Sequence, residues 1–413
     1  MQRTEYGGDS GGVTMEKWRE CKIGDLLDIK HGFAFLGEYF GSSGTHVVLT
    51  PGNFLEEGGF KEKADKAKWY GGPIPDDYVL NEGDLIVAMT EQAEGLLGSS
   101  ALIPRSGVYL HNQRLGLVQI RDRKQADQHF IYYLFNSKPV RQQIRGSASG
   151  TKIRHTAPSR IAEVKVSVPP LPVQRRIARI LSAYDELMEN SQRRIRILEA
   201  MARALYREWF VHFRFPGHEK HPRIASPLGD IPQGWEVLEF RHLFDIRYGK
   251  TLPKTEISDS GPFPVYGAGD VIGFYDKMLC PNKCALVTSR GNGSGTVWRT
   301  REAAFVTNNS LIMLPQENRS HWDYSFVELL LKHANVMEAK TGSAQPQVTI
   351  ENLNYVKAIV PTKPLVEKFC AIATPIYEQV DSLFRQIQNL RRTRDLLLPR
   401  LLSGQVNLGE SNG

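Results

Sequence analysis

One glycine-rich segment, Gly291-Asn292-Gly293-Ser294-Gly295, has the composition of a loop that binds a nucleotide or S-adenosylmethionine. Such loops connect a strand to a helix. Here a predicted strand, Ala285–Thr288, precedes the loop, but Thr296-Val297-Trp298 has the pattern of another strand. The chain also lacks the Asn-Pro-Pro-aromatic and Asp-Pro-Pro-Tyr segments that hold an extruded adenine. We therefore expect no cofactor in this chain and no catalytic residues for methyl transfer.

Two other patterns resemble catalytic or metal sites. Glu163-Val164-Lys165 resembles the end of a nuclease motif, but the only Pro-Asp pair, Pro75-Asp76, lies far upstream, and the same strand recurs at 355–357 without the acid. We interpret Glu163 and Lys165 as a pair at a strand edge. The possible metal ligands have no second pair at a suitable spacing, so we expect no metal site; they are Cys280 with Cys284 and His218 with His221. The four cysteines form no disulfide framework.

The overall charge favours an acidic partner. The 413 residues carry a net charge of +7, with a pI near 9.1. No apolar run approaches the roughly 20 residues that span a bilayer, and the N-terminus is too polar for a signal peptide. We expect a cytoplasmic protein that binds nucleic acid rather than a membrane.

Polar loop residues are the candidates for contact with nucleic acid, because Lys and Arg bind phosphates while Arg, Asn and Gln read base edges. In the first half of the chain they are Arg114, Lys152, Arg154 and His155, with Lys61, Lys63, Lys66 and Lys68 as contacts to the phosphate backbone. In the second half they are Lys250, Lys254, Arg290, Asn292, Asn309, Gln345 and Gln347. For each of them the alternative is an ordinary solvated surface, and for the repeated Asn112 and Asn308 a structural turn is favoured.

The elements that must position these residues occur twice. Residues 164–181 read VKVSVPPLPVQRRIARIL, and residues 356–373, an offset of 192, read VKAIVPTKPLVEKFCAIA. Each stretch predicts a strand, a proline break and a long helix. Upstream, Tyr109–Leu115 aligns with Phe305–Leu311 at an offset of 196, and Trp18 aligns with Trp235 at an offset of 217. The chain is therefore a duplication whose frames match while the middles differ, which suits one scaffold with two recognition surfaces.

The two helices carry apolar seams of equal length, which predict an antiparallel intramolecular coiled coil. The first seam is Ile177, Leu181, Tyr184, Met188, Ser191, Ile195, Leu198, Ala202, Leu205 and Trp209, and adding 192 gives the second. At roughly 1.5 Å per residue, the first seam spans about 48 Å, on the order of one and a half turns of B-DNA. We expect the first helix to run from about Val173 to Phe213. The second should start after Pro364, kink or start late at Pro375, and stop at Pro399 and Gly404.

These observations predict an α+β chain with two tandem-duplicated globular domains joined and separated by two long antiparallel helices, with pseudo-two-fold symmetry. The predicted segments are a disordered extension at 1–14, a first domain at 15–168, a central helical region at 169–214, a linker at 215–234, a second domain at 235–360, a distal helical region at 361–404 and a tail at 405–413. A core hairpin within one domain is the alternative for the helices.

The order of these segments resembles the specificity subunit of type I restriction-modification enzymes. The resemblance covers nearly the whole chain, and its most specific pieces are PPLPVQRRIARIL at 169–181, LEAMARALYREWFVHF at 198–213, IPQGWEV at 231–237 and LLLPRLLSG at 396–404. It implies that each globular domain is a target recognition domain for one half of a bipartite DNA sequence. It also implies that the helices bind two methyltransferase subunits, that S-adenosylmethionine is bound by those subunits, and that restriction subunits join the full complex.

On that reading, the outer face of the first helix is the candidate partner surface. Its residues are Arg175, Arg179, Arg196, Arg203, Tyr206, Arg207 and Phe210, while Trp209 lies on the seam and is expected to pack internally. The alternatives are the specificity subunit of a related system with a different nuclease, a protein-interaction scaffold that does not bind DNA, and an enzyme with unrecognised motifs.

Overall fold

The structure is a computed structural model that describes residues 18–63, 66–91, 95–150, 153–291, 293–342 and 346–406. The chain forms two compact units: the first holds residues 1–188 and 389–413, and the second holds residues 189–388. The predicted disordered segment 1–14 lies outside the described residues. None of the helices in the described ranges combines the length and the apolar character that crossing a membrane requires.

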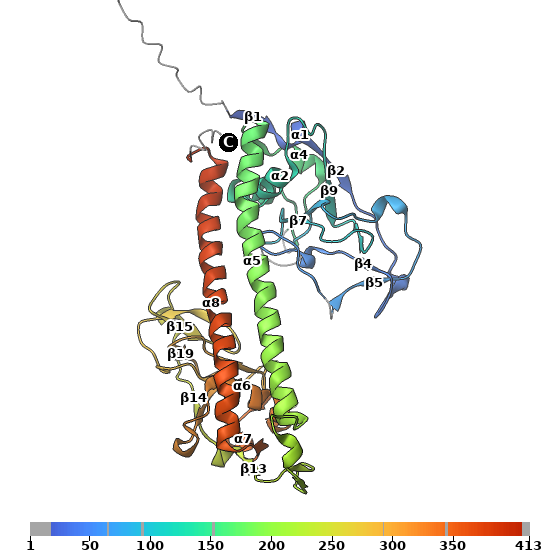
Figure 1. The fold of residues 1–413 in the computed structure, drawn as a ribbon. Helices are drawn as coiled ribbons and strands as arrows, with labels where there is room; N and C mark the ends of the chain where they lie inside the picture. The colour runs from blue at the N-terminus through green and yellow to red at the C-terminus, as the bar shows by residue number, and fades with distance from the viewer. Residues whose placement is uncertain are drawn as a thin grey trace, which may run out of the picture. The chain divides into compact units, whose positions relative to one another are not determined.

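The first unit is built on a four-stranded antiparallel sheet in the order β2-β9-β6-β7. In β6 (Leu85–Ala88), Leu85 and Val87 enter one apolar core while Ile86 and Ala88 enter another, so both faces of the strand are buried. The other strands and helices of this unit are β1 (Arg19–Lys22), α1 (Ile23–Leu26), β2 (Leu27–His31), β3 (Phe40–Gly41), β4 (His46–Val48), β5 (Trp69–Tyr70), β7 (Ser100–Leu102), β8 (Tyr109–Leu110), β9 (Leu115–Ile120), α2 (Gln128–Phe135), α3 (Lys138–Gly146), α4 (Pro158–Ala162) and β10 (Lys165–Val168) (Figure 1).

The second unit repeats this plan with the sheet β14-β20-β17-β18. Ala285 and Val287 of β17 (Ala285–Thr288) enter the main core with α6 (Tyr324–His333), while Leu286 enters a smaller one. The remaining strands and helices are β11 (Arg223–Ile224), β12 (Ile231–Pro232), β13 (Glu236–Glu239), β14 (Phe244–Tyr248), β15 (Phe263–Tyr266), β16 (Val271–Tyr275), β18 (Val297–Arg299), β19 (Phe305–Val306), β20 (Ser310–Pro315), β21 (Lys340–Thr341), β22 (Gln347–Val348), α7 (Ile350–Asn354) and β23 (Lys357–Val360).

The strand pairings reproduce the duplication. β1 pairs with β10, with Arg19 opposite Val168, and β13 pairs with β23, with Glu236 opposite Val360. The partners are therefore related by the predicted offsets of 217 and 192. The predicted α+β duplication is confirmed.

One predicted offset is wrong by one residue. His31 pairs with Gly116 in the first unit, and Tyr248 pairs with Leu311 in the second. His31 and Tyr248 are 217 residues apart, so the matching positions Gly116 and Leu311 give an offset of 195 rather than 196. The sequence alignment matched Leu115 with Leu311, and both leucines occupy buried strand positions. An alignment based on apolar residues therefore cannot distinguish an offset of 195 from one of 196 here.

Both long helices contribute to both units. α5 (Leu171–Tyr206) continues as a π-helical turn, Arg207–Val211, close to the predicted end. α8 (Lys363–Leu402) passes through Pro375 and Pro399. Of the two alternatives predicted at Pro375, a kink or a late start, the late start is therefore wrong, and so is the predicted stop at Pro399. Both prolines are exposed, and so are Ala371 and Asp395 four residues before them, so the carbonyls left without an N–H donor can bond to water.

Gly404 ends α8 as predicted. Its φ is +72°, and the Gln405 amide donates to the Arg400 carbonyl at 3.0 Å, which is the left-handed cap that glycine favours. Trp18 lies against Gly404, where an added Cβ would be 2.9 Å from the indole nitrogen. In the second unit the equivalent Trp235 stacks on Phe215, with ring centroids 5.4 Å apart, so each repeat begins with a tryptophan at the end of a long helix.

The predicted seams are buried or half-buried at every position. In the second unit, Tyr206 and Trp209 of α5 meet Phe369 of α8, with ring centroids 5.8 and 6.0 Å apart. Earlier in α5, Glu199 and Arg203 lie close enough to Tyr377 of α8 for their charges to shift the pKa of its hydroxyl. Later residues of α5 therefore face earlier residues of α8. The antiparallel pairing is confirmed in this unit, where α6 also packs on α8 (Figure 1).

Candidate nucleic-acid interface

Three segments of the second unit converge where β17 ends. The Ser289 amide donates to the Asn309 carbonyl at 2.8 Å, and the Val348 amide donates to the Ser289 carbonyl at 2.8 Å. Arg290 forms an antiparallel bridge with Gln347. The structure thus brings together Arg290, Asn309 and Gln347, whose side chains are exposed.

The first unit repeats this junction where β6 ends. The Arg114 carbonyl accepts a hydrogen bond from the Met89 amide at 2.9 Å, and Thr90 forms an antiparallel bridge with His155. The Thr90 hydroxyl and His155 Nδ1 lie 3.1 Å apart, and Arg114 and His155 are both exposed. We call these two junctions the loop edges: Thr90, Arg114 and His155 in the first unit, and Arg290, Asn309 and Gln347 in the second.

The other described candidates lie at varying distances from the loop edges. Lys250 is exposed and bridges to Thr307, beside the turn that carries Asn309. Arg154 is half-buried and donates from Nη1 to the Arg145 carbonyl at 3.4 Å, so its guanidinium is partly engaged. Lys254 begins a short turn, Lys254–Glu256, and is exposed.

Three predicted contacts, Lys152, Asn292 and Gln345, lie outside the described residues. The structural role predicted for Asn112 is confirmed: its Oδ1 accepts from the Arg114 amide at 3.0 Å, and its carbonyl accepts from the Leu115 amide at 2.9 Å. Asn308 lies in the matching turn, closed by the Ser310 amide donating to the Thr307 carbonyl at 3.1 Å.

The predicted lysines of the first unit form one positive cluster. Burial, followed by the charges of Lys61, Lys68 and Lys66, lowers the pKa of Lys63. The Lys63 ammonium lies against Gly52, in the turn after β4. Any side chain at position 52 would displace this ammonium group. Lys61, Lys66 and Lys68 are exposed, so their charges remain available to an anionic partner.

The segments that resembled catalytic motifs have structural roles. The glycine loop joins β17 to β18, which pair antiparallel with Ala285 opposite Arg299, so it lies in a hairpin rather than before a helix, as predicted. Glu163 Oε2 lies 2.6 Å from Lys22 Nζ, and Lys22 pairs with Lys165 in the β1–β10 ribbon. Both residues therefore lie beside this ribbon, but the ion-pair partner of Glu163 is Lys22 and not the predicted Lys165.

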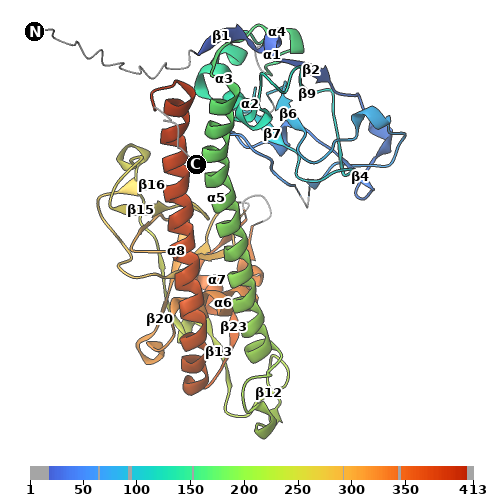
Figure 2. The same cartoon turned by 45° about the horizontal axis from the view of Figure 1, so that its top comes forward.

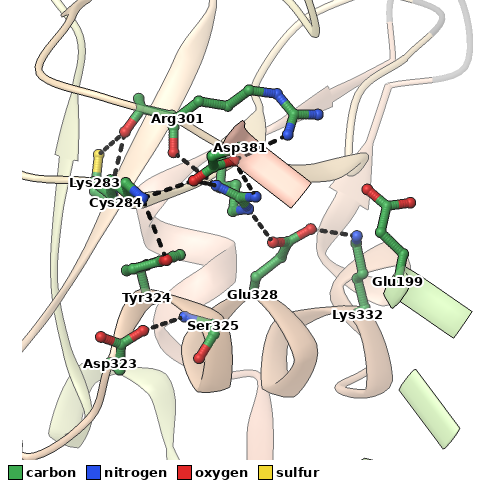
Figure 3. A network of polar contacts seen from close by, with 12 residues as sticks. Glu199, Lys283, Cys284, Arg301, Asp323, Tyr324, Ser325, Glu328, Lys332 and Asp381 are labelled. Atoms are coloured by element: carbon green, nitrogen blue, oxygen red, sulfur yellow. Dashed lines mark hydrogen bonds and ion pairs between the residues drawn. The ribbon is translucent and has the colours of Figure 1, made fainter. Parts of the chain in front are cut away.

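A buried ionic cluster ties the globular part of the second unit to α8 (Figure 3). Asp381 on α8 is 1% exposed and contacts Lys283 at 2.7 Å, Arg299 at 2.6 Å and Arg301 at 3.1 Å. Arg299 also reaches Glu328 of α6 at 3.1 Å. Burial alone would raise the pKa of Asp381, but the hydrogen bonds and charges of Arg299 and Lys283 outweigh it and hold the pKa below its usual value.

The first unit uses a different polar contact between its globular part and the helices. The Tyr133 hydroxyl donates to Asp185 Oδ2 on α5 at 2.6 Å, and Arg394 Nη1 on α8 donates to Asp185 Oδ1 at 2.6 Å. Asp185 therefore joins α2, α5 and α8. Neither this contact nor the Asp381 cluster was found from the sequence, because the partners are distant in the chain and share no motif.

The structure corrects part of the predicted partner surface. Arg175, Arg179, Arg196, Arg203 and Arg207 are exposed as predicted, with Arg203 paired to Glu199 at 3.6 Å. Tyr206 and Phe210 are each only 5% exposed, so they cannot be surface contacts. They pack against Phe326 of α6, with centroids 5.9 and 5.4 Å away, because the globular part of the second unit covers this side of α5.

Three exposed apolar side chains on α5 and on the π-helical turn that follows it were not predicted. Ile197, Met201 and Val211 are 54%, 53% and 41% exposed. Ile197 and Met201 are four residues apart and therefore lie on one helix face, so helical periodicity in the sequence could have indicated this pair. Apolar side chains grouped in this way are typical of a protein interface.

Comparisons with known proteins agree with the duplication. Residues 15–200 and 232–390 both match the family described as type I restriction modification DNA specificity domain. The MjaIX specificity subunit of a type I restriction enzyme from Methanocaldococcus jannaschii is 25% identical over 302 residues, covering 68% of this chain and 69% of that protein. A putative type I specificity subunit from Mycoplasma pneumoniae is 22% identical over 368 residues, covering 87% of this chain and 89% of that protein.

A solved structure has the same fold. The crystal structure of a type I restriction-modification system S subunit from M. genitalium aligns with a TM-score of 0.64 at 20% identity, covering 94% of this chain and 97% of that chain. The family match extends over both repeats, and the frame that it covers is the one built by the paired ribbons and the long helices. The chain belongs to the family of type I restriction-modification DNA specificity subunits.

Proposed function

We propose that each unit of this chain reads one half of a bipartite duplex DNA target. The observation that carries this proposal is the repeated loop edge, where one frame presents Arg114 and His155 in the first unit and Arg290, Asn309 and Gln347 in the second. A shared frame with different exposed side chains is what two half-sites of different sequence require. The target is therefore split, with unread base pairs between the halves.

The side chains at the loop edges have the chemistry for base recognition. In this proposal the Arg290 guanidinium donates to O6 and N7 of guanine, and the amides of Asn309 and Gln347 pair with adenine. Lys61, Lys66 and Lys68 bind phosphates beside the first half-site, and Lys250 does so beside the second. The net charge of +7 supports association with DNA at long range.

The helices set the spacer and bind the partners. Their seams hold a fixed number of residues, so the helical rise of about 1.5 Å per residue fixes the separation of the half-sites. Two methyltransferase subunits dock on the exposed faces, using Arg175, Arg179 and Arg196 together with the exposed apolar residues Ile197, Met201 and Val211. Restriction subunits join the assembled complex.

The chemistry of methyl transfer belongs to the partner in this proposal. The glycine loop that resembles a cofactor loop lies in a β-hairpin, and no adenine-pocket segment is present in the sequence. S-adenosylmethionine is then bound by the methyltransferase subunits, and this chain is a non-catalytic recognition subunit. Its place in the cell is the cytoplasm, with the DNA that it recognises.

The test is methylation mapping. Co-expression with the cognate methyltransferase subunit should produce adenine methylation in one split motif, read by single-molecule sequencing of the host DNA. The purified chain alone should bind that motif with a strong salt dependence and transfer no labelled methyl group. Methyl transfer by the chain alone, or a continuous motif without a spacer, would contradict the proposal.

A further inference from the structure

Strands β15 and β16 of the second unit form a hairpin (Figure 2), and the first two residues of β16 are exposed apolar side chains. Val271 is 37% exposed and Ile272 is 50% exposed. The side chain of Ile272 covers Gly267, where an added Cβ would lie 2.9 Å from its Cγ2. Val271 and Ile272 are not part of the apolar core, so their exposed side chains are free to contact a ligand.

Hydrogen bonds hold this turn in one conformation. The Gly267 amide donates to the Asp270 carbonyl at 2.9 Å, and the Val271 amide donates to Asp270 Oδ1 at 2.8 Å. Ile272 is therefore presented by an ordered hairpin, so little conformational freedom is lost when it makes a contact.

The same turn is fastened to the segments that carry the proposed base-reading residues. The Ser310 hydroxyl donates to the Gly267 carbonyl at 2.8 Å, next to Asn309. The Thr288 hydroxyl donates to the Ala268 carbonyl at 3.2 Å, two residues before Arg290. The apolar tip and the polar loop edge thus belong to one surface.

The first unit carries different chemistry at the matching place. β4 runs parallel to β8 and β15 runs parallel to β19, so the segments after β4 and after β15 are equivalent. Four residues after β4, Gly52 lies against the Lys63 ammonium, whereas directly after β15, Gly267 lies against the Ile272 side chain. A lysine there suits a phosphate, while an isoleucine suits an apolar group on a base.

Duplex DNA offers one apolar group in its major groove, the C5-methyl of thymine. Resting on the proposed function, we propose that Ile272 reads a thymine methyl group in the half-site bound by the second unit. Asp270 does not oppose this, because its Oδ1 is bonded to the Val271 amide within the turn.

The experiment pairs the side chain with the methyl group. After the target has been mapped, each thymine of the half-site assigned to the second unit is replaced by deoxyuridine, which lacks only the methyl. At one thymine, the full-length wild-type chain should bind about fourfold more weakly, the factor expected for one buried methyl group. Ile272→Ala should bind the thymine duplex about fourfold more weakly and lose no further affinity with deoxyuridine at that position.

Two controls separate this contact from general effects. Met278→Ala changes a 49% exposed residue beyond the other end of β16, and Ile153→Ala changes a 52% exposed isoleucine in the first unit; both should keep the wild-type sensitivity in this half-site. A half-site without a sensitive thymine, or Ile272→Ala with full sensitivity, would overturn the inference. Absence of any split, sequence-dependent binding would appear before the deoxyuridine step and would overturn the proposed function instead.

Discussion

Arg299 at the end of β18 makes two hydrogen bonds to Asp381 on α8, from Nη2 to Oδ1 at 2.6 Å and from Nη1 to Oδ2 at 3.1 Å. The two side chains are 5% and 1% exposed. They are 82 residues apart in the sequence, yet this planar contact fixes one strand of the second unit on one turn of the helix. The orientation of the second loop edge on its helix therefore depends on a buried ion pair.

Removing the charge of Asp381 should destabilise the second unit. Asp381→Asn removes the buried anion that Lys283, Arg299 and Arg301 share and leaves Glu328 as the remaining anionic partner of Arg299, which costs about 3–5 kcal/mol of unfolding free energy. Urea unfolding followed by tryptophan fluorescence measures this loss. Asp245→Asn, which breaks the exposed pair of Asp245 with Arg247, should have a much smaller effect, because solvent screens this pair. Equal effects of the two substitutions would show that the cluster has no special role.

The first unit should lose stability in mild acid because of His111. Its Nε2–H donates to the Leu115 carbonyl at 2.9 Å, and burial lowers its pKa from 6.5 to about 4. Between these values the unfolded chain binds a proton that the folded chain does not, so stability is full above pH 6.5 and falls as the pH drops toward 4. The loss is about 3 kcal/mol over that window.

A substitution isolates this contribution from that of other groups. His111→Gln can still donate to the Leu115 carbonyl but does not titrate, so its unfolding free energy should change less between pH 7 and pH 4 than that of the wild type. His155→Gln removes an exposed histidine of the same unit and should leave the wild-type pH dependence intact. An unchanged pH dependence in His111→Gln would refute the assignment.

Much of the fold could be predicted because the duplication repeats the same elements at matching positions in the two halves of the sequence. The ribbons, the strand–proline–helix units and both seams follow from apolar periodicity and from offsets between matching residues. The predictions at Pro375 and Pro399 were wrong because proline disfavours a helix in general. Here both prolines lie on the exposed side of α8, where water can bond to the carbonyl groups that lack an N–H donor. Periodicity alone does not tell which side of a helix faces water.

The site was predictable only in outline. Arg290, Asn309 and Gln347 were singled out as polar loop residues, but their convergence depends on backbone bonds between segments 20 to 60 residues apart. Tyr206 and Phe210 lie on the side of α5 that α6 covers, which no helical pattern reveals. In the sequence, Asp381 has the pattern of a surface residue of a helix. Its burial follows from the fold, which places Lys283 and Arg299 against it.

The lysine cluster of the first unit should govern the salt dependence of DNA binding. Replacing Lys66 by Ala removes one phosphate contact and should lower the slope of log affinity against log salt by about 0.9. Lys61→Ala and Lys68→Ala should act similarly, with the same half-site preference. Lys220→Ala removes an equal charge from an exposed turn of the second unit, His218–Lys220, and should leave the slope unchanged. A change of preferred sequence in these variants would assign the lysines to base reading.

The two halves of the target should be independent. Exchanging residues 15–168 for those of a relative with a different target replaces the first loop edge and keeps the second, with Arg290 and Gln347 in place. Methylation mapping of the co-expressed complex should give a motif with one new half and one old half. A motif in which both halves differ would contradict the assignment of one half-site to each unit.

The helices should act as a ruler for the spacer. Ser191 is a buried seam residue of α5, and antiparallel pairing places the region of Arg385 in α8 near it, because Tyr206 and Trp209 meet Phe369. Inserting four residues after Ser191 and four after Arg385 lengthens both helices by about 6 Å and rotates them by some 40°. Four residues are close to one turn, so both seams can form again. We expect both half-sites to stay unchanged while the spacer grows by one or two base pairs, at about 3.4 Å per pair.

Insertion in α5 alone shifts one seam against the other and should reduce methylation, which serves as the control. A doubly extended variant that keeps the original spacing, or that alters a half-site, would refute the ruler.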